Sequence, residues 1–232
     1  MKEIEIKETG YTYEMREELK TLRTNIQFCG DDKRVILLTS SVASEGKSTT
    51  ALNLAISLAE LGKKVMLVDA DIRKSVMVSR IKAGKTEYGL SHFLAGQCQV
   101  SEAVYAARNI DDLYLMVAGP VVPNPTELLS TDRFEKMLIA FRKVYDYIII
   151  DGPPLGMVVD SAIIAKHCDG AAIVIESGTI KYRFAQDVKA RLLNAGCPVL
   201  GVILNKVDRK KNGKYYGKYY GKYYGQYYGK EK

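Results

Sequence analysis

Residues 35–54, VILLTSSVASEGKSTTALNL, restrict the possible folds of this chain more than any other stretch. The apolar run Val35–Leu38 leads into a loop of small residues, and the residues after Gly46 have the composition of a helix. A strand, a loop and a helix in this order gather backbone N–H groups around one concavity, where the helix dipole also favours negative charge. The stretch therefore predicts a phosphate-binding loop.

The loop follows the spacing G-x-x-x-x-G-K-[ST], with Ser41 in place of the first glycine and Ser44 where a glycine is often found. Lys47 is expected to reach the β- and γ-phosphates of a nucleotide, and the Ser48 hydroxyl is expected to bind Mg²⁺. The flanking strand and helix disfavour the alternative, a chance Gly-Lys-Ser in an ordinary turn. The expected nucleotide-binding residues of the loop are Ser44, Glu45, Gly46, Lys47, Ser48 and Thr49.

Two further apolar strands end in carboxylates. The first leads into Asp69-Ala70-Asp71 and the second into Asp151-Gly-Pro-Pro. Side chains alternate along a strand, so Asp69 and Asp71 can face the same side, and ligands of open α/β sheets bind at the carboxyl ends of the strands. Asp151 has the form of a Walker B acid, which reaches Mg²⁺. A single Asp after a strand is commonly a loop cap, but three beside a phosphate loop favour Mg²⁺ binding and proton transfer.

Strands alternate with helices over most of the chain, which implies right-handed βαβ crossovers. The predicted fold class is α/β, a P-loop NTPase with a mostly parallel sheet flanked by helices on both faces. We expect an N-terminal part (1–30) that begins with a charged, loose arm over 1–12, a P-loop domain (31–208) and a tail (209–232). The last predicted strand ends at Asn205, which could hydrogen-bond a base edge or cap the turn, and both assignments remain open.

Residues 13–28 have the apolar spacing of an amphipathic helix. Its polar side carries Glu17, Lys20 and Arg23, which are three residues apart and therefore neighbours on one face. This face is either a solvated surface with local ion pairs or a contact surface for a neighbouring subunit. The spacing alone favours the solvated surface.

The C-terminal stretch 213–229 repeats a four-residue unit, GKYYGKYYGKYYGQYYG. We expect it to be flexible and exposed, because its glycines disfavour a helix and no residues alternate as in a half-buried strand. It could bind single-stranded nucleic acid through stacking tyrosines and basic lysines, or present tyrosines to a kinase. The candidate phosphoacceptors are Tyr215, Tyr216, Tyr219, Tyr220, Tyr223, Tyr224, Tyr227 and Tyr228.

The net charge of +7 belongs to this tail. From Arg209 onward there are eight Lys or Arg and one Glu, whereas residues 1–208 hold 26 basic and 26 acidic residues. A balanced body argues against a broad nucleic-acid-binding face, so no nucleic-acid partner is expected. The chain starts without a signal peptide, no apolar run approaches the ~18 residues of a membrane span, and its cysteines are scattered as reduced thiols are. These features predict a cytoplasmic protein.

The phosphate loop, Asp69-x-Asp71, Ile-Ile-Asp151-x-Pro-Pro and the tyrosine cluster together resemble the bacterial tyrosine kinases, a family with a deviant Walker fold. They look most like the cytoplasmic kinases of Gram-positive capsule or exopolysaccharide operons. The resemblance implies that the catalytic residues are Lys47, Asp69, Asp71 and Asp151. It further implies that Mg²⁺ is bound by Ser48, Asp71 and Asp151.

The resemblance also implies a reaction and its setting. With ATP and Mg²⁺, the chain would autophosphorylate its tyrosine cluster in trans and regulate capsular or exopolysaccharide synthesis and chain length. The implied partners are a transmembrane activator of the polysaccharide co-polymerase type, a chain-length regulator, and a cognate tyrosine phosphatase. The activator would hold the kinase at the inner face of the cell membrane. Asp69 is favoured as the base and Asp71 as the acid nearer the metal, although the sequence does not separate the two roles.

Members of this family form a ring-shaped homo-oligomer through an E-x-x-R-x-x-R motif, and the tail of one subunit enters the active site of the next. Here Lys20 replaces the first arginine of the motif. A lysine offers a point charge where an arginine offers a bidentate fork, so this substitution bears on the stability of the ring. The resemblance favours the subunit surface for the face that Glu17, Lys20 and Arg23 share.

The alternative function is that of a partitioning or site-selection ATPase of the same fold, which hydrolyses ATP to switch a dimer on membrane or DNA. Those proteins carry a second, signature lysine just after the first loop position, where this chain has Val42. A nucleotide-sensing scaffold without activity would leave three acids idle. The missing lysine and the tyrosine-rich tail favour the kinase.

Overall fold

The computed structural model of the chain describes residues 2–7, 10–82 and 86–208. Within these residues nine strands form one sheet in the order β4-β1-β5-β6-β3-β7-β2-β8-β9. The strands are β1 (Lys2–Ile6), β2 (Val35–Ser40), β3 (Val65–Asp69), β4 (Ile81–Lys82), β5 (Tyr105–Ala107), β6 (Leu113–Met116), β7 (Tyr147–Asp151), β8 (Gly170–Glu176) and β9 (Val199–Asn205). The helices are α1 (Tyr13–Phe28), α2 (Lys47–Ala59), α3 (Leu90–Leu94), α4 (Pro125–Leu129), α5 (Asp132–Arg142), α6 (Asp160–Ala165) and α7 (Tyr182–Asn194). Two short 3₁₀ turns, Met77–Arg80 and Val100–Glu102, lie between them.

The six strands from β6 to β9 in this order pair in parallel, and β1 also pairs in parallel with β5. Antiparallel pairing is confined to β1 with β4 and β5 with β6. Parallel neighbours need crossover connections, and the helices between the strands provide them. The predicted α/β fold class with a mostly parallel sheet is confirmed.

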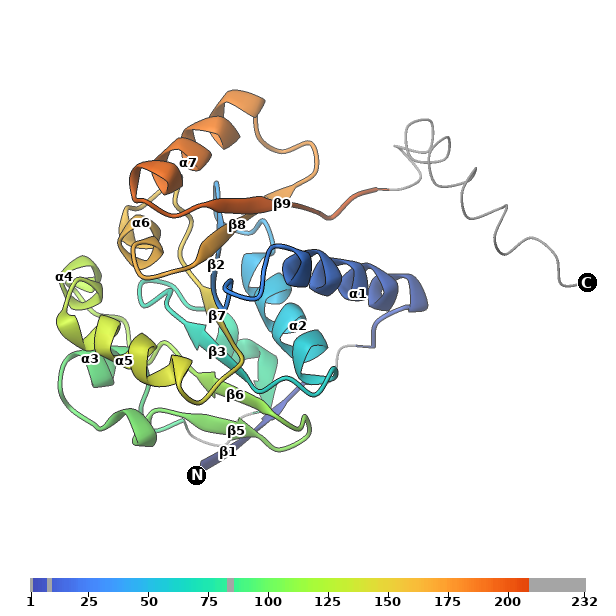
Figure 1. Cartoon of the computed structure of the whole chain (residues 1–232). Coiled ribbons are helices and arrows are strands. Elements are labelled where there is room, and N and C mark those ends of the chain that lie inside the picture. The colour runs from blue at the N-terminus through green and yellow to red at the C-terminus, as the bar shows by residue number, and fades with distance from the viewer. Residues whose placement is uncertain (1, 8–9, 83–85, 209–232) are drawn as a thin grey trace, which may run out of the picture.

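Helices cover both faces of the sheet, with α1 and α2 on one face and α3 to α7 on the other (Figure 1). The packing of the central strand β2 explains why its first four residues, Val35–Leu38, are all apolar. Leu37 packs into the core beneath α3 to α7, whereas Ile36 and Leu38 pack into the core beneath α1 and α2. All three side chains are completely buried. A strand with helices on both faces has no side that tolerates charge, so it reads as a continuous apolar run.

The expectation of a loose arm over residues 1–12 is wrong for Lys2–Ile6, which form strand β1. Ile4 and Ile6 are buried at 3% and 2% exposure, and β1 pairs with both β5 and β4. The sequence Lys-Glu-Ile-Glu-Ile alternates charged and apolar residues, which is the period of a half-buried strand. The high charge of the segment concealed this alternation.

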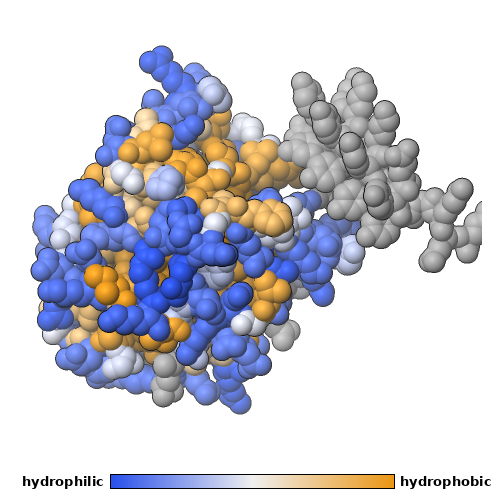
Figure 2. All heavy atoms as spheres, viewed as in Figure 1, coloured by the Kyte–Doolittle hydropathy of each residue, from blue (hydrophilic) through white to orange (hydrophobic). Residues whose placement is uncertain are grey.

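The cover over the sheet thins at its β9 edge. Figure 2 shows apolar surface gathered over β9, where Val202 and Leu204 are 58% and 46% exposed. The end of β9 brings Asn205 to the same edge of the sheet as the loop after β2, because β2 and β9 both pair in parallel with β8.

Among the described residues, no helix has both the length and the apolarity that crossing a bilayer requires.

We expect Ile6→Ala to lower the free energy of unfolding by about 2–4 kcal/mol, because it removes buried methylene groups and leaves a cavity under β1. Equilibrium denaturation with urea measures this difference. The control Glu3→Ala, at an exposed position of the same strand, should stay within about 0.5 kcal/mol of the wild type. A wild-type denaturation curve for Ile6→Ala would show that β1 does not contribute to the folded core.

Candidate functional site

The loop between β2 and α2 has the backbone of a phosphate cradle. Gly46, the N-cap of α2, has a φ of 91°, and a Cβ there would lie 2.1 Å from the side-chain nitrogen of Asn205. The positive φ favours glycine, and a larger residue would also displace the Asn205 amide. The helix begins at Lys47, so its positive N-terminal end faces the loop. The strand, loop and helix that the sequence predicts are therefore present.

The two departures from the loop consensus have visible consequences. Ser44 has a φ of 67°, in the left-handed region that glycine adopts without strain. Ser41 is fully buried, and its hydroxyl has no hydrogen-bond partner within the described structure. Both serines occupy positions where glycine would remove a steric or polar penalty.

Glu45 is a buried brace of the loop. Its carboxylate accepts hydrogen bonds from the backbone N–H groups of Ser41 at 2.7 Å and Val42 at 2.8 Å, and from that of Glu176 at 3.2 Å. The side chain is 1% exposed. Any contact of Glu45 with a nucleotide would therefore come from its main chain, and its side chain positions the loop. No local pattern in the sequence predicts this contact with β8.

Three strands bring Lys47 and the predicted acids together. The Lys47 ammonium nitrogen lies 3.1 Å from Asp71 Oδ2, 3.2 Å from Asp151 Oδ1 and 3.3 Å from the Ser48 hydroxyl. All four residues are buried. Burial alone lowers the pKa of Lys47, but the charges of Asp151 and Asp71 outweigh it and raise that pKa. Lys47 is therefore a fixed positive charge at the carboxyl end of the sheet.

Asp69 lies beside Asp151 but has different partners. The two residues face each other in the β3–β7 register. The Asp69 carboxylate accepts hydrogen bonds from the Asp71 backbone N–H at 3.2 Å and from the Ser75 hydroxyl. Burial, followed by the charge of Asp151, raises the pKa of Asp69 to about 8. Burial also raises the pKa of Asp151, and the charge of Lys47 opposes this shift.

The residues around Lys47 suit a bound Mg²⁺ ion. Asp151 Oδ2 is buried and has no hydrogen-bond partner within the described structure, which is a costly arrangement unless another group satisfies it. Mg²⁺ usually takes one or two protein carboxylates and completes its shell with phosphate and water. No group of three or more His, Cys, Asp or Glu side chains arranged to hold a metal occurs in the described residues. Ser48, Asp71 and Asp151 fit the smaller share that a nucleotide-bound ion requires.

Asn205 contacts the loop rather than its own turn. Its amide nitrogen donates to the Glu45 carbonyl oxygen at 2.9 Å. The base-edge contact and the turn cap were the two possibilities from sequence, and this bond to the loop is a third. Thr49, also expected at the nucleotide, lies in the first turn of α2.

The polar residues Glu17, Lys20 and Arg23 of α1 all make contacts within their own chain. The Lys20 ammonium pairs with Glu17 at 2.7 Å on an exposed face. Arg23 donates to the Ser57 carbonyl oxygen of α2 at 2.7 Å. The tyrosine cluster from Tyr215 to Tyr228 lies outside the described residues.

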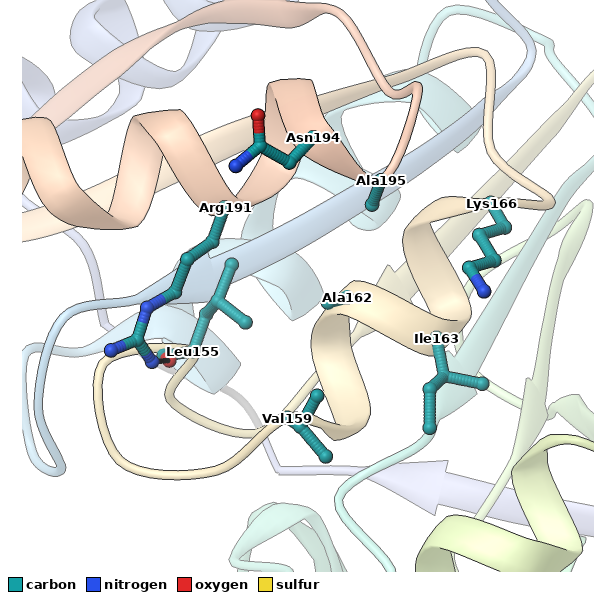
Figure 3. Close-up of a pocket in the computed structure, with 8 residues that line it drawn as sticks. All are labelled: Leu155, Val159, Ala162, Ile163, Lys166, Arg191, Asn194 and Ala195. Atoms are coloured by element: carbon teal, nitrogen blue, oxygen red, sulfur yellow. Dashed lines mark hydrogen bonds between the residues drawn. The ribbon is translucent and has the colours of Figure 1, made fainter.

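A separate cavity of about 420 Å³ lies between α6 and α7 and holds none of the predicted site residues. Its two cations, Lys166 and Arg191, lie at opposite ends of the cavity and do not converge on one point (Figure 3). One guanidinium nitrogen of Arg191 already donates to the Leu155 carbonyl oxygen. The full lining is Leu155, Val159, Ala162, Ile163, Lys166, Arg191, Asn194 and Ala195. This arrangement does not form a second phosphate site.

Comparison with known proteins assigns the family. Residues 33–184 match a family described as an AAA domain. The chain is 44% identical over 192 residues to the tyrosine-protein kinase CpsD of Streptococcus agalactiae, covering 83% of each chain. The chain belongs to the bacterial tyrosine kinases. The predicted family and enzyme class, a protein-tyrosine kinase, are thereby confirmed.

Two further similarities extend this result. The solved BceF tyrosine kinase domain shares 36% identity with a TM-score of 0.75, and the match covers 83% of this chain and 78% of that one. The tyrosine-protein kinase wzc of Salmonella typhi is 32% identical over 201 residues, which are 85% of this chain and 27% of wzc. A nucleotide-binding P-loop kinase fold therefore recurs both as a chain of this size and as a minor part of a longer protein.

We expect Asp69→Asn to change how the stability of the chain depends on pH. Folded Asp69 keeps its proton to about pH 8, whereas an unfolded aspartate releases it near pH 3.8. Its stabilising contribution is thus complete below about pH 4 and is lost as the pH rises through about 8, at a slope of at most about 1.4 kcal/mol per pH unit. Asn does not titrate, so the variant lacks this loss.

Urea denaturation in the presence of a chelator, at pH values between about 5 and 8, measures the effect. The wild type should lose stability relative to Asp69→Asn across this range. The matched control Asp187→Asn, at an exposed position of α7, should follow the wild type. Parallel pH profiles for Asp69→Asn and the wild type would contradict the raised pKa.

Proposed function

We propose that this tyrosine kinase uses Mg-ATP to autophosphorylate its tyrosine cluster, residues 215–228, in trans between subunits. The observation that supports the proposal most is the buried Lys47 ammonium held between Asp71 and Asp151 at the end of the phosphate loop. In phosphoryl transfer the protein contributes mainly positioning and charge neutralisation, and this cluster offers both. We propose the tail, 209–232, as the acceptor segment, because its repeated tyrosines are the only tyrosine-rich stretch of the sequence.

In this proposal the chain's own residues divide the chemistry. Lys47 and the loop N–H groups bind the phosphates, and Ser48, Asp71 and Asp151 hold the metal. Mg²⁺, when bound, neutralises charge on the transferred group. The tyrosine oxygen bonds to the γ-phosphorus while the bond from that phosphorus to the ADP oxygen breaks. The phenolic proton passes to a carboxylate, which lowers the barrier because free tyrosine has a pKa of about 10.

We assign the proton-accepting role to the ionised form of Asp69, which becomes more populated as the pH rises toward its pKa of about 8. Asp71 and Asp151 are bonded to Lys47, so their charge is committed to the phosphate end of the site. Asp69 is held instead by the Ser75 hydroxyl and the Asp71 N–H, next to that pair. Asn205 and the remaining loop residues from Ser44 to Thr49 are proposed to complete the nucleotide site.

The proposed setting is a peripheral kinase complex at the cell membrane that regulates capsular or exopolysaccharide synthesis and chain length. The match to wzc supports a partner protein for this chain, because the region of wzc that is similar to the chain makes up only 27% of wzc. We propose that a separate transmembrane activator is this partner. A cognate tyrosine phosphatase would remove the phosphates from the tyrosine cluster.

The switch-ATPase alternative gains no support from the loop. The backbone N–H of Val42, at the position of the signature lysine, is tied to Glu45, and its side chain carries no charge. We therefore retain the kinase function alone.

The test of the function is Lys47→Met in the full chain incubated with Mg-ATP and a fused activator segment. Mass spectrometry of residues 215–228 should show phosphate on the wild type and a loss of at least about 100-fold in the variant, because the charge on the transferred group is left without its cation. Lys143→Met, at an exposed position after α5, is the matched control, and circular dichroism checks that both variants are folded, since Lys47 is buried. Normal phosphorylation of Lys47→Met would refute the catalytic assignment, and ATP hydrolysis with an unmodified wild-type tail would indicate the switch ATPase.

The two acids of β3 and its following loop can be separated by the same assay. Asp69→Asn should keep the Mg-dependent affinity for nucleotide and lose tyrosine phosphorylation, whereas Asp71→Asn should lose the Mg-dependent part of the affinity as well. Both are measured with a fluorescent ADP at varied Mg²⁺. The reverse pattern would exchange the two assignments.

We also propose a ring-like homo-oligomer that uses Glu17, Lys20 and Arg23. Arg23 already bonds to Ser57 of its own chain, so Arg23→Ala would disturb the α1–α2 contact along with any interface. Lys20 is 55% exposed in its side chain and is the cleaner probe. Sedimentation should show a larger oligomeric fraction for Lys20→Arg, since the fork of arginine binds carboxylates more specifically. An unchanged or smaller fraction would remove Lys20 from the interface.

A further inference from the structure

We propose that Lys206 is a positioning residue of the phosphate loop, which it holds from the end of β9. The proposal rests on the nucleotide-binding role of that loop. The Lys206 ammonium donates to the Ser44 carbonyl oxygen at 2.7 Å and pairs with the Glu176 carboxylate at 2.8 Å. Lys206 follows β9 directly and has a φ of 53°, so its own backbone also adopts a conformation that non-glycine residues rarely take.

Glu176 connects this contact to the brace inside the loop. Its backbone N–H donates to the Glu45 carboxylate, while its side chain accepts from Lys206. Glu176 also faces Asn205 across the β8–β9 register, and the next N–H, of Ser177, donates to the Asn205 carbonyl oxygen at 2.9 Å. Residues at the ends of both β8 and β9 thus form hydrogen bonds with the phosphate loop.

These hydrogen bonds determine the direction of the loop N–H groups that a phosphate would contact. Asn205 and Lys206 bind two successive carbonyl oxygens, those of Glu45 and Ser44. In a planar trans peptide the C=O and N–H of one unit point in opposite directions. Holding the Ser44 carbonyl therefore orients the Glu45 N–H, and holding the Glu45 carbonyl orients the Gly46 N–H. A loop that lost the Lys206 contact would be free to rotate the peptide that follows the strained Ser44.

The expected effect is moderate because the pair is partly solvated. The side chains of Lys206 and Glu176 are 47% and 29% exposed, so solvent screens their attraction. An exposed lysine contributes little to the core, and its loss should leave the fold intact. A change in nucleotide affinity with an unchanged melting temperature is therefore the diagnostic result.

The experiment compares Lys206→Met with the wild-type full chain. We expect the dissociation constant for fluorescent ADP and the KM for ATP to rise about 3–10-fold, with kcat within about twofold, which fits one screened, charge-assisted hydrogen bond. Lys206→Arg should restore most of the affinity, because it keeps the donor and the charge. The matched control Lys189→Met, at an exposed position of α7, should bind as the wild type does.

Glu176→Gln supplies a second line of test. It should weaken ADP binding in the same direction, and the double variant should lose less than the two single losses combined, since the residues act through one contact. Unchanged ADP binding by Lys206→Met, or a loss that appears only in kcat, would overturn the proposal. ADP binding requires no turnover, so this result stands even if the tail proves not to be the acceptor.

Discussion

A buried ammonium group needs anions around it, and the arrangement of this sheet provides them. Lys47 begins α2 after the loop that follows β2, Asp71 follows β3, and Asp151 ends β7, with β7 lying between β2 and β3. Placing one cation against two carboxylates at about 3 Å requires these three strands to run in parallel and end at the same level. Removing either kind of partner would leave an unpaired buried charge, which is among the largest destabilising changes known for single residues. The arrangement of the strands therefore determines the geometry of the charge cluster.

Much of this arrangement could be predicted from the sequence, and the reason is local. The phosphate loop and the aspartates after two apolar strands are patterns of consecutive residues, and parallel strands necessarily bring their carboxyl ends together. The helix expected over 13–28 and the strand ending at Asp151 occur where they were predicted. Strand β1 was missed because its two buried isoleucines alternate with charges that suggested solvent.

The braces of the loop could not be predicted in this way. Glu45 bonds to a backbone group 131 residues away, and Lys206 to one 162 residues away. No spacing rule connects such positions, and an isolated Glu or Lys in a polar loop reads as solvent-exposed. These contacts follow only from the order in which β8 and β9 extend the sheet beyond β2. The role of Asn205 was undecided from sequence for the same reason.

The contacts of Lys47 have a consequence for what can enter the site. A phosphate alone could draw Lys47 away from Asp71 and Asp151, but it would leave those two carboxylates facing a third anion. A metal ion alone could satisfy the carboxylates, but it would leave the lysine beside an unbalanced positive charge. Only a ligand that brings both charges at once replaces both halves of the cluster. We therefore expect the ion pairs of Lys47 to favour the binding of a cation and a nucleotide together over the binding of either one alone.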